Sequence, residues 1–282
     1  MSSKKTQRVL VLGHKGMLGS MVLHHFAPQF DVVTIENRFD ADDPRTFLTA
    51  ARSCRADVVI NAIGGIKQRI KDVHALLATN AYLPALLRSH LPVETLLIHP
   101  STDCVFDGKT GFYASNHTYT AKDPYGLSKA LGESILSSGN TLIIRCSIIG
   151  PEVPPRSSGL LGWFLSQPEN AILQGFADHH WNGITTLEWA RIAARLIARP
   201  SPSSQGLLVQ PGTSHRHTKY DLLKLFSTHF RPDIRVERVL TGDPVDRTLQ
   251  PTLVAPPLDD QLCELKREMQ AIAQAIARRG AS

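Results

Sequence analysis

Short apolar runs alternate with stretches of helical periodicity over residues 8–150. The runs that predict β-strands are RVLVLG, DVVTIE, ADVVINAIG, ETLLIHPST and TLIIRCSIIG. The stretches that predict helices are MLGSMVLHHF, PRTFLTAARSC, residues 72–90 and the segment after Asp123. Such alternation forms right-handed βαβ units, with helices on both faces of a parallel sheet. We therefore expect an α/β fold with a doubly wound parallel sheet.

The alternation ends at Gly150. Residues 151–183 are rich in proline and glycine and predict a loop with one short helix, LLGWFLSQ. Helical patterns return at 187–198, 219–230 and 258–279. In the last of these, apolar residues repeat at spacings of three and four, which predicts an amphipathic helix docked on the body. They are Leu258, Leu262, Leu265, Met269, Ile272 and Ile276.

These patterns predict two regions. Residues 1–150 would form the main domain, and residues 151–282 a smaller, mixed C-terminal region that binds substrate. Part of the second region, about residues 184–200, is expected to pack back on the first.

Composition narrows the class of protein. The chain has 282 residues, 42% of them hydrophobic, and can bury a large core. No window approaches the roughly 20 apolar residues of a membrane span, and the start MSSKKTQ lacks the apolar core of a signal peptide. We therefore expect a soluble, cytoplasmic protein that does not bind membranes.

Charge and cysteine usage argue against a nucleic-acid-binding protein and against a metalloprotein. The formal charge of +6 comes from dispersed Lys and Arg, which favours an anionic small molecule over nucleic acid as the partner. The four cysteines and the histidine pairs lack the spacing of a metal site, so reduced thiols and no metal are expected.

The segment GHKGMLG places three glycines between the first predicted strand and the first predicted helix. Gly13, Gly16 and Gly19 would be explained by a tight strand-to-helix turn alone. In this position, however, glycines also let the backbone approach a pyrophosphate, whose charge then lies at the helix N-terminus. We therefore interpret residues 1–150 as an NAD(P)-binding Rossmann domain.

The segment PYGLSK places Tyr125 and Lys129 one helical turn apart. Asp123 is suited to cap this helix and Pro124 to begin it. An exposed Tyr stacked on a Lys stem is the structural alternative. Against it stands Thr102, which comes just past a predicted parallel strand, where ligands bind in open α/β sheets. Together Thr102, Tyr125 and Lys129 form a candidate proton-donor group.

The chemistry expected of this group depends on charge. Tyrosine has an unperturbed pKa near 10, so a nearby ammonium group such as that of Lys129 would favour the phenolate and bring Tyr125 into a useful range. Lys129 is also expected to hold the ribose of the nicotinamide, and the Thr102 hydroxyl the reacting substrate oxygen.

Four segments in order, GHKGMLG, DVVINAIG, STDCVFDGKTGFY and YGLSKALGE, resemble the extended short-chain dehydrogenases, in particular the dTDP-4-dehydrorhamnose reductase group. The resemblance is dense over residues 8–145. Beyond it, LLGWFLSQ, NGITTLEWARIA and TKYDLLKLF are similar to a subgroup of sugar-nucleotide reductases, and similarity fades after about residue 230.

The resemblance implies a reductase, with one departure at the STD segment. The dTDP-4-dehydrorhamnose reductases usually carry tyrosine where this chain has Cys104, a change that would reshape the substrate pocket without removing Tyr125. The related 4,6-dehydratases carry Thr-Asp-Glu here, so Thr102, Asp103 and Cys104 argue against dehydration. Epimerisation stays open, although no second acid-base group for it is evident.

The cofactor is expected to be NADPH, with NADH as the alternative. After the second predicted strand, Glu36 suits a ribose 2'-hydroxyl, whereas Arg38 suits a 2'-phosphate. Arg38 falls where the arginine of the similar subgroup lies, and Lys15 adds positive charge to the glycine loop. The expected cofactor-binding residues are Gly13, Lys15, Gly16, Met17, Leu18, Arg38, Asp40, Ala41, Asn61, Ala62, Ile63, Gly64, Tyr125 and Lys129.

Substrate residues are expected mainly in loops, and for each a purely structural role is an equal alternative. The candidates are Lys67, Gln68, Asp103, Cys104, Ser147, Trp163, Trp181, Asn182 and Arg247. With them we expect an NAD(P)H-dependent reductase of the 4-keto group of a nucleotide-activated, 6-deoxy sugar. A cofactor-binding regulatory subunit, as in methionine adenosyltransferase, and an epimerase are the alternatives, and a homodimer is left open.

Overall fold

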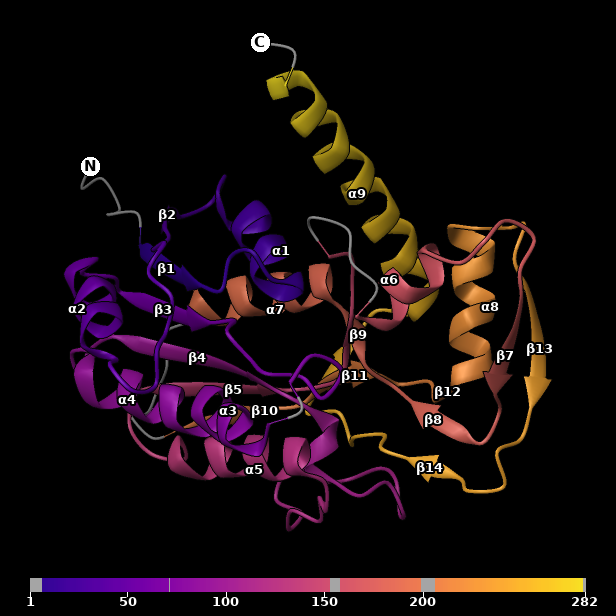
Figure 1. Cartoon of the computed structure of the whole chain (residues 1–282), viewed down its shortest axis with the longest axis horizontal. Coiled ribbons are helices and arrows are strands. Elements are labelled where there is room, and N and C mark those ends of the chain that lie inside the picture. Colours follow the sequence, from indigo (N-terminus) through magenta and orange to yellow (C-terminus); the bar gives the residue numbers. More distant parts are fainter. Residues whose placement is uncertain (1–6, 71, 153–157, 199–205, 281–282) are drawn as a thin grey trace.

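The computed structural model describes residues 7–70, 72–152, 158–198 and 206–280, with side chains up to residue 274. Its centre is a six-stranded parallel sheet in the order β10-β5-β4-β3-β1-β2 (Figure 1). The strands are β1 (Arg8–Leu12), β2 (Asp31–Val33), β3 (Val58–Asn61), β4 (Leu96–Ser101), β5 (Thr141–Arg145) and β10 (Leu207–Val209). This arrangement confirms the expected doubly wound Rossmann-like α/β fold.

Helices cover both faces of this sheet. They are α1 (Met17–Phe26), α2 (Arg45–Ser53), α3 (Val73–Leu77), α4 (Leu83–His90), α5 (Pro124–Ile135) and α7 (Thr186–Ile197). Because successive strand residues point to opposite faces, the apolar runs supply two cores at once. Val9 and Val11 pack with α1 and α7, whereas Leu10 and Leu12 pack with α2 and α4.

Two predicted elements differ in detail. The run DVVTIE forms a strand only over its first three residues, at the edge of the sheet beside β1. Residues 72–90 do not form one helix, because a π-helical segment, η1 (Ala78–Tyr82), separates α3 from α4. Asn80 in η1 is buried and hydrogen-bonds Gly65 and Ser128, which ties this irregular turn to α5.

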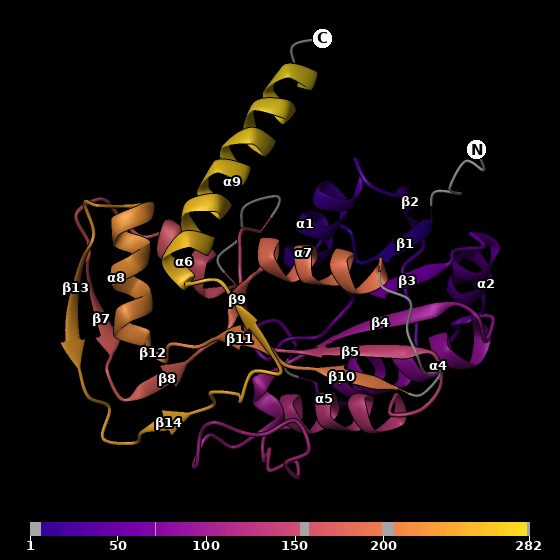
Figure 2. The same ribbon diagram turned by 180° about the vertical axis from the view of Figure 1, so that it is seen from behind.

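The division at residue 150 remains a prediction, but chain from beyond it completes the sheet. β10 pairs with β5, and α7 packs against α1 (Figure 2). Trp189 of α7 is fully buried in the same core as Val9 and Val11. The helix therefore belongs to the packing of the sheet, because its buried side chains share one core with those of α1 and β1.

The rest of the C-terminal region forms a second core beside the sheet, seen at the right of Figure 1. Its small sheets pair β11 (Pro211–Thr213) with β15 (Leu253–Ala255), β7 (Ile172–Phe176) with β13 (Arg235–Val239), and β6 (Ile148–Ile149) with β9 (Ile184–Thr185). A third kind of sheet has three strands in the order β12 (His217–Thr218), β8 (His179–Trp181) and β14 (Val245–Asp246). The helices of this region are α6 (Leu160–Leu165), α8 (Lys219–His229) and α9 (Leu258–Gly280). In the main sheet, a 3-10 turn, η2 (Asp103–Val105), follows β4.

The last helix, α9, extends out from the body (Figure 1). Leu258, Leu262 and Leu265 are buried in the second core, and Met269 and Ile272 pack against it. The predicted docking is thus seen for these residues, while the side chain of Ile276 lies outside the described residues. Within the described part of the chain, no helix combines the length and the apolar character that crossing a membrane requires.

Candidate active site

A cavity of about 360 Å³ lies at the carboxyl ends of four strands of the sheet, β1, β3, β4 and β5. Segments that follow these strands line it, together with residues of α5, α6, β8 and α8. Ligands of open α/β sheets bind at this edge, at the point where connections from neighbouring strands lead to opposite sides of the sheet.

The glycine loop is shaped by close backbone packing. Gly13 has a φ of +76°, and a Cβ added there would lie 2.9 Å from the backbone of Ala62. A Cβ at Gly19 would lie 2.2 Å from the Gly13 carbonyl oxygen. At Gly16 the nearest atom would be 3.3 Å away, and this residue lines the cavity. Gly13 and Gly19 therefore close the turn, while Gly16 leaves room beside the cavity.

Asn61, at the end of β3, lines the same part of the cavity. It is 1% exposed, and neither its amide nitrogen nor its amide oxygen has a hydrogen-bond partner among the described residues. A buried amide without partners costs free energy unless a ligand satisfies it. Asn61 and the open side of Gly16 thus fit the pyrophosphate and ribose of a dinucleotide.

Beside β4, Thr102 begins the 3-10 turn η2. Its hydroxyl accepts a hydrogen bond from the Cys104 N–H at 3.2 Å and donates one to Asp103 Oδ1 at 3.0 Å. Burial and the Asp103 carboxylate raise the pKa of the Cys104 thiol to about 12. Cys104 therefore lines the cavity as a neutral thiol and is no nucleophile at neutral pH.

Tyr125 reaches the cavity from the first turn of α5. Asp123 caps this helix by accepting a hydrogen bond from the Gly126 N–H at 3.1 Å, as its sequence predicts. Gly126 also lets α5 approach the turn after β4, because a Cβ there would lie 2.2 Å from the Cys104 carbonyl oxygen. The short contact sets Tyr125 beside Thr102 and Cys104.

The charge expected to favour the Tyr125 phenolate is not what the structure shows. Burial raises the pKa of Tyr125 above its ordinary value, and Cys104 adds to the increase. Lys129 directs its Nζ to the Pro100 carbonyl oxygen at 2.7 Å and lies 3.4 Å from His99 Nε2. The prediction relied on helical spacing to bring the ammonium group to the phenol, whereas Lys129 Nζ bonds the Pro100 carbonyl oxygen at the edge of the same cavity.

Lys129 is itself strongly affected by burial. It is 6% exposed, and desolvation lowers its pKa to about 8. His99, also buried, carries a pKa well below its usual value because of desolvation and the charge of Lys129. The imidazole is therefore neutral beside the ammonium group.

Most predicted site residues meet at this cavity. Those that line it are Gly16, Met17, Leu18, Asn61, Ala62, Ile63, Gly64, Lys67, Gln68, Thr102, Asp103, Cys104, Tyr125, Lys129, Ser147 and Trp181. Those that are not among its lining residues are Gly13, Lys15, Arg38, Asp40, Ala41, Trp163, Asn182 and Arg247. The roles assigned to both sets stay predictions. The first set shares one cavity, whereas the second set lies outside its lining.

Several residues of the second set have other contacts. Asn182 is buried and exchanges hydrogen bonds with the Leu249 backbone at 2.8 and 2.9 Å, which holds two loops together. Trp163 is about a third exposed on α6. Arg247 donates to the Phe106 carbonyl oxygen at 3.0 Å, although its charge acts on Cys104.

At the edge of the sheet, Arg38 and Asp40 are exposed. Lys15 donates to Glu36 at 2.5 Å, so the carboxylate expected to meet a ribose contacts the glycine loop instead. The surface predicted to meet adenine is therefore exposed at Arg38 and Asp40, in contrast with the buried Asn61.

Sequence reasoning missed three charged residues of the cavity, Arg69, Glu152 and Lys219. Lys219 begins α8, and its pKa is lowered by desolvation while Asp103 opposes the change. Glu152 is 8% exposed and pairs with Arg69 and with the Ser158 N–H. The segment TKYDLL signalled a helix start, but nothing local indicated that it begins at the cavity. Within the described residues, no group of three or more possible metal ligands is present.

The chain resembles known proteins in sequence and in fold. The family model described as RmlD substrate binding domain matches residues 7–152. No curated protein matches the chain with significance. A dTDP-4-dehydrorhamnose reductase from Bacillus anthracis str. Ames, solved in complex with NADP, superposes with a TM-score of 0.80 at 17% identity, over 93% of this chain and 99% of that chain.

Two further solved structures share the fold at similar distance. The Bordetella bronchiseptica enzyme WbmG, in complex with NAD and UDP, has a TM-score of 0.72 at 15% identity, over 92% of this chain and 93% of that chain. A dTDP-glucose 4,6-dehydratase from Bacillus anthracis str. Ames, in complex with NAD, has a TM-score of 0.71 at 15% identity, over 93% and 96%.

Proposed function

This chain belongs to the family of the RmlD substrate binding domain, and from that premise we propose that it reduces the 4-keto group of a nucleotide-activated 6-deoxy sugar with NADPH. The observation that carries the proposal is that Thr102, Tyr125 and Lys129 line one cavity with the glycine loop and Asn61. The chain is thus an NAD(P)H-dependent oxidoreductase of the short-chain dehydrogenase class.

NADPH supplies a hydride to the C4 carbon of the sugar when it is bound. Tyr125 gives its phenolic proton to the C4 oxygen. The raised pKa makes the phenol a weaker acid in the ligand-free protein, so the transfer depends on the strong basicity of the alkoxide that forms at C4. The Thr102 hydroxyl, which donates to Asp103 in the ligand-free protein, bonds the same oxygen in the proposed mechanism. Lys129 holds the nicotinamide ribose with its ammonium group.

Lys67 and Lys219, which also line the cavity, supply positive charge for an anionic substrate. The charges of Asp103 and Arg247 also act on Lys219, so the cationic excess lies close to the reacting group. A nucleotide-activated sugar carries a diphosphate and satisfies this charge.

For the cofactor, NADPH is favoured over NADH by Arg38 and Lys15, two cations beside the end of β2. The structural relatives are divided, since the reductase from Bacillus anthracis was solved with NADP and WbmG with NAD. A cytoplasmic location, expected from the sequence, stays part of the proposal.

The function is tested by NADPH consumption with a panel of dTDP-, UDP-, GDP- and CDP-linked 4-keto sugars. Oxidation of NADPH with formation of a C4 alcohol, and its loss in Tyr125→Phe, is the expected result. Tight NADPH binding with no turnover across the panel would contradict the reductase and favour a cofactor-binding regulatory subunit. Exchange of C4 configuration without net NADPH consumption would indicate an epimerase.

We further propose that a second copy of this chain covers the exposed apolar face of α3, η1 and α5. Its side chains are Val73, Leu77, Tyr82, Leu127, Leu131 and Ile135, between 37% and 52% exposed. The face carries no charge in these positions, so two copies can meet without electrostatic repulsion. Sedimentation should show a homodimer that Leu131→Lys dissociates; a monomeric wild type would contradict the proposal.

A further inference from the structure

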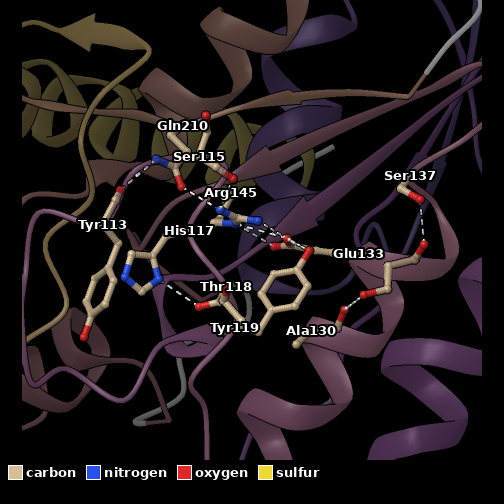
Figure 3. Close-up of polar contacts among 11 residues, drawn as sticks. Tyr113, Ser115, His117, Thr118, Tyr119, Ala130, Glu133, Ser137, Arg145 and Gln210 are labelled. Carbon is tan, nitrogen blue, oxygen red and sulfur yellow. Dashed lines mark hydrogen bonds and ion pairs between the residues drawn. The ribbon is translucent and has the colours of Figure 1, made fainter.

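A buried ion pair lies behind the cavity, between α5 and β5. The side chains of Glu133 and Arg145 are 0% and 1% exposed. Arg145 Nε donates to both oxygens of the Glu133 carboxylate at 3.0 Å, and its terminal nitrogen also donates to the same carboxylate (Figure 3). The pair is therefore completely removed from water.

Further hydrogen bonds hold both members of the pair. Tyr119 donates its hydroxyl to Glu133 Oε2 at 3.0 Å, and Arg145 donates to Gln210 Oε1 at 2.8 Å and to the Ser115 carbonyl oxygen at 3.2 Å (Figure 3). The guanidinium also lies 5.3 Å from the ring centre of Phe106. These contacts fix the carboxylate in a single position.

Stability alone is a weak reason for such a pair. Desolvating two charges costs several kcal/mol per ion, and well-packed apolar side chains of similar volume are often as stable. The neighbouring apolar residues of α5 make the contrast plain, because Leu127, Leu131 and Ile135 are exposed while Glu133 is buried. The helix turns its charged face inward.

The inward face of α5 also carries Lys129, one helical turn before Glu133. The groups that act on Lys129 come from two elements: His99 and the Pro100 carbonyl oxygen from β4, and Glu133 from α5 itself. Arg145 of β5 and Tyr119 contact Glu133, while Asp103 and Cys104 of η2 lie at the cavity. Among the groups that face Lys129 directly, Glu133 is the carboxylate.

We propose that Glu133, held by Arg145, is a positioning residue that keeps Lys129 in its ammonium form. The inference rests on the proposed function, because an ammonium at residue 129 matters for catalysis only if Lys129 holds the cofactor ribose. A buried lysine tends to lose its proton, since a low dielectric disfavours the charge. A fixed carboxylate one turn away opposes that loss, and its own ion pair prevents it from turning into the cavity.

The direction of the shifts agrees with this arrangement. Desolvation lowers the pKa of Lys129 to about 8, and Glu133 acts against the decrease. Without the carboxylate, a larger share of Lys129 would be neutral at physiological pH.

The test separates charge from shape at residue 133. Glu133→Gln keeps the size of the side chain and removes its charge, whereas Glu133→Asp keeps the charge and shortens the side chain. The pKa of Lys129 is measured in the ligand-free protein by trace acetylation with acetic anhydride over a pH series, followed by peptide mass spectrometry. Tyr119→Phe, which removes one hydrogen bond to Glu133 and no charge, is the matched control.

The wild-type labelling midpoint is expected near pH 8. Glu133→Gln should lower it by about one pH unit or more, because an opposite charge within reach shifts a pKa by about 1 to 3 units. Glu133→Asp and Tyr119→Phe should stay closer to the wild type than to Glu133→Gln. An unchanged midpoint in Glu133→Gln would overturn the proposal, because the charge at residue 133 would then have no effect on the pKa of Lys129. An equal decrease in Glu133→Asp would also overturn it, because the shape of the side chain would then set that pKa.

The pH dependence of kcat/KM provides the link to function. The alkaline limb should move to lower pH in Glu133→Gln by the same amount as the labelling midpoint. If the midpoint moves and the limb does not, the electrostatic inference stands and the role of Lys129 in the proposed function fails. Should Glu133→Gln not fold, the double variant Glu133→Gln/Arg145→Gln replaces it, because it leaves no buried unpaired charge. Since the cation of Arg145 is lost as well, a smaller decrease of the midpoint is expected, and a midpoint at or above that of the wild type would overturn the proposal.

Discussion

The two ends of the cavity are built in different ways. At the glycine-loop end, backbone close to single strands forms the wall: Gly16 follows β1, and Ala62 and Gly64 follow β3. At the substrate end, Lys67, Cys104 and Lys219 come from segments far apart in the sequence. A wall of backbone accepts any dinucleotide phosphate, whereas a wall of side chains can be changed residue by residue. The difference suggests that cofactor binding and substrate choice can be altered separately.

The largest expected effect is at Tyr125, where the two ends meet. Tyr125→Phe keeps the ring and the helix but removes the proton donor, so turnover should fall by about 100-fold or more while NADPH affinity barely changes. Steady-state kinetics and a fluorescence titration of NADPH measure the two quantities. Tyr82→Phe, on the exposed side of η1, serves as the control. Near-normal turnover of Tyr125→Phe would remove the basis for the mechanism.

A smaller effect is expected at Lys219, which tests the substrate end alone. A charge-assisted hydrogen bond contributes about 1.5 to 3 kcal/mol, so Lys219→Met should lower kcat/KM for the sugar nucleotide by about tenfold or more. The loss should fall mainly on KM, and NADPH affinity should be unchanged. Lys224→Met, at an exposed position of the same helix, should have no effect. A parallel loss of NADPH affinity would show that the two ends are not separable.

Arg38 tests the cofactor end. If its guanidinium meets a 2'-phosphate, Arg38→Ala should remove a preference for NADPH over NADH of about tenfold and leave NADH binding unchanged. The two dissociation constants are compared by titration. Arg45→Ala, which removes an exposed arginine paired with Asp43, is the control. Equal affinities for both cofactors in the wild type would refute this assignment.

The smallest effect is expected at Cys104. Because its pKa is raised to about 12, the thiol stays protonated below about pH 11, and alkylation by iodoacetamide should be slow at pH 8. Cys104→Ser should change turnover by less than about threefold, since a hydroxyl of similar size replaces a neutral thiol. Rapid alkylation of Cys104, followed by peptide mass spectrometry, would contradict this assignment of a neutral thiol.

The predictability of the site follows the same division between the two ends. GHKGMLG and DVVINAIG each predicted residues that line the cavity from a few positions in the sequence, because the turn and the strand end are local structures. Lys219 and Glu152 could not be identified in this way, since their approach to Cys104 and Arg69 depends on how the C-terminal region packs on the sheet. The assigned functional roles, from the glycine loop to Arg247, remain predictions that the variants above test.

Periodicity was also a limited guide to burial. Leu127, Leu131 and Ile135 form an apolar stripe on α5, yet these residues are exposed, and Lys129 and Glu133 are buried. The pattern shows that α5 is a helix with two faces. It does not show which face packs inward, because buried charges are tolerated where partners such as Arg145 arrive from another strand.

The sequence by itself determined the parallel sheet, the glycine turn after β1 and the helix that carries Tyr125 and Lys129. Each depends on local periodicity, on glycine where backbones touch, or on a cap such as Asp123. Only the tertiary structure decided that Lys129 points to Pro100 rather than to Tyr125, and that Glu133 lies buried behind it. Electrostatic effects depend on distance and desolvation in three dimensions, and neither can be read from spacing along the chain.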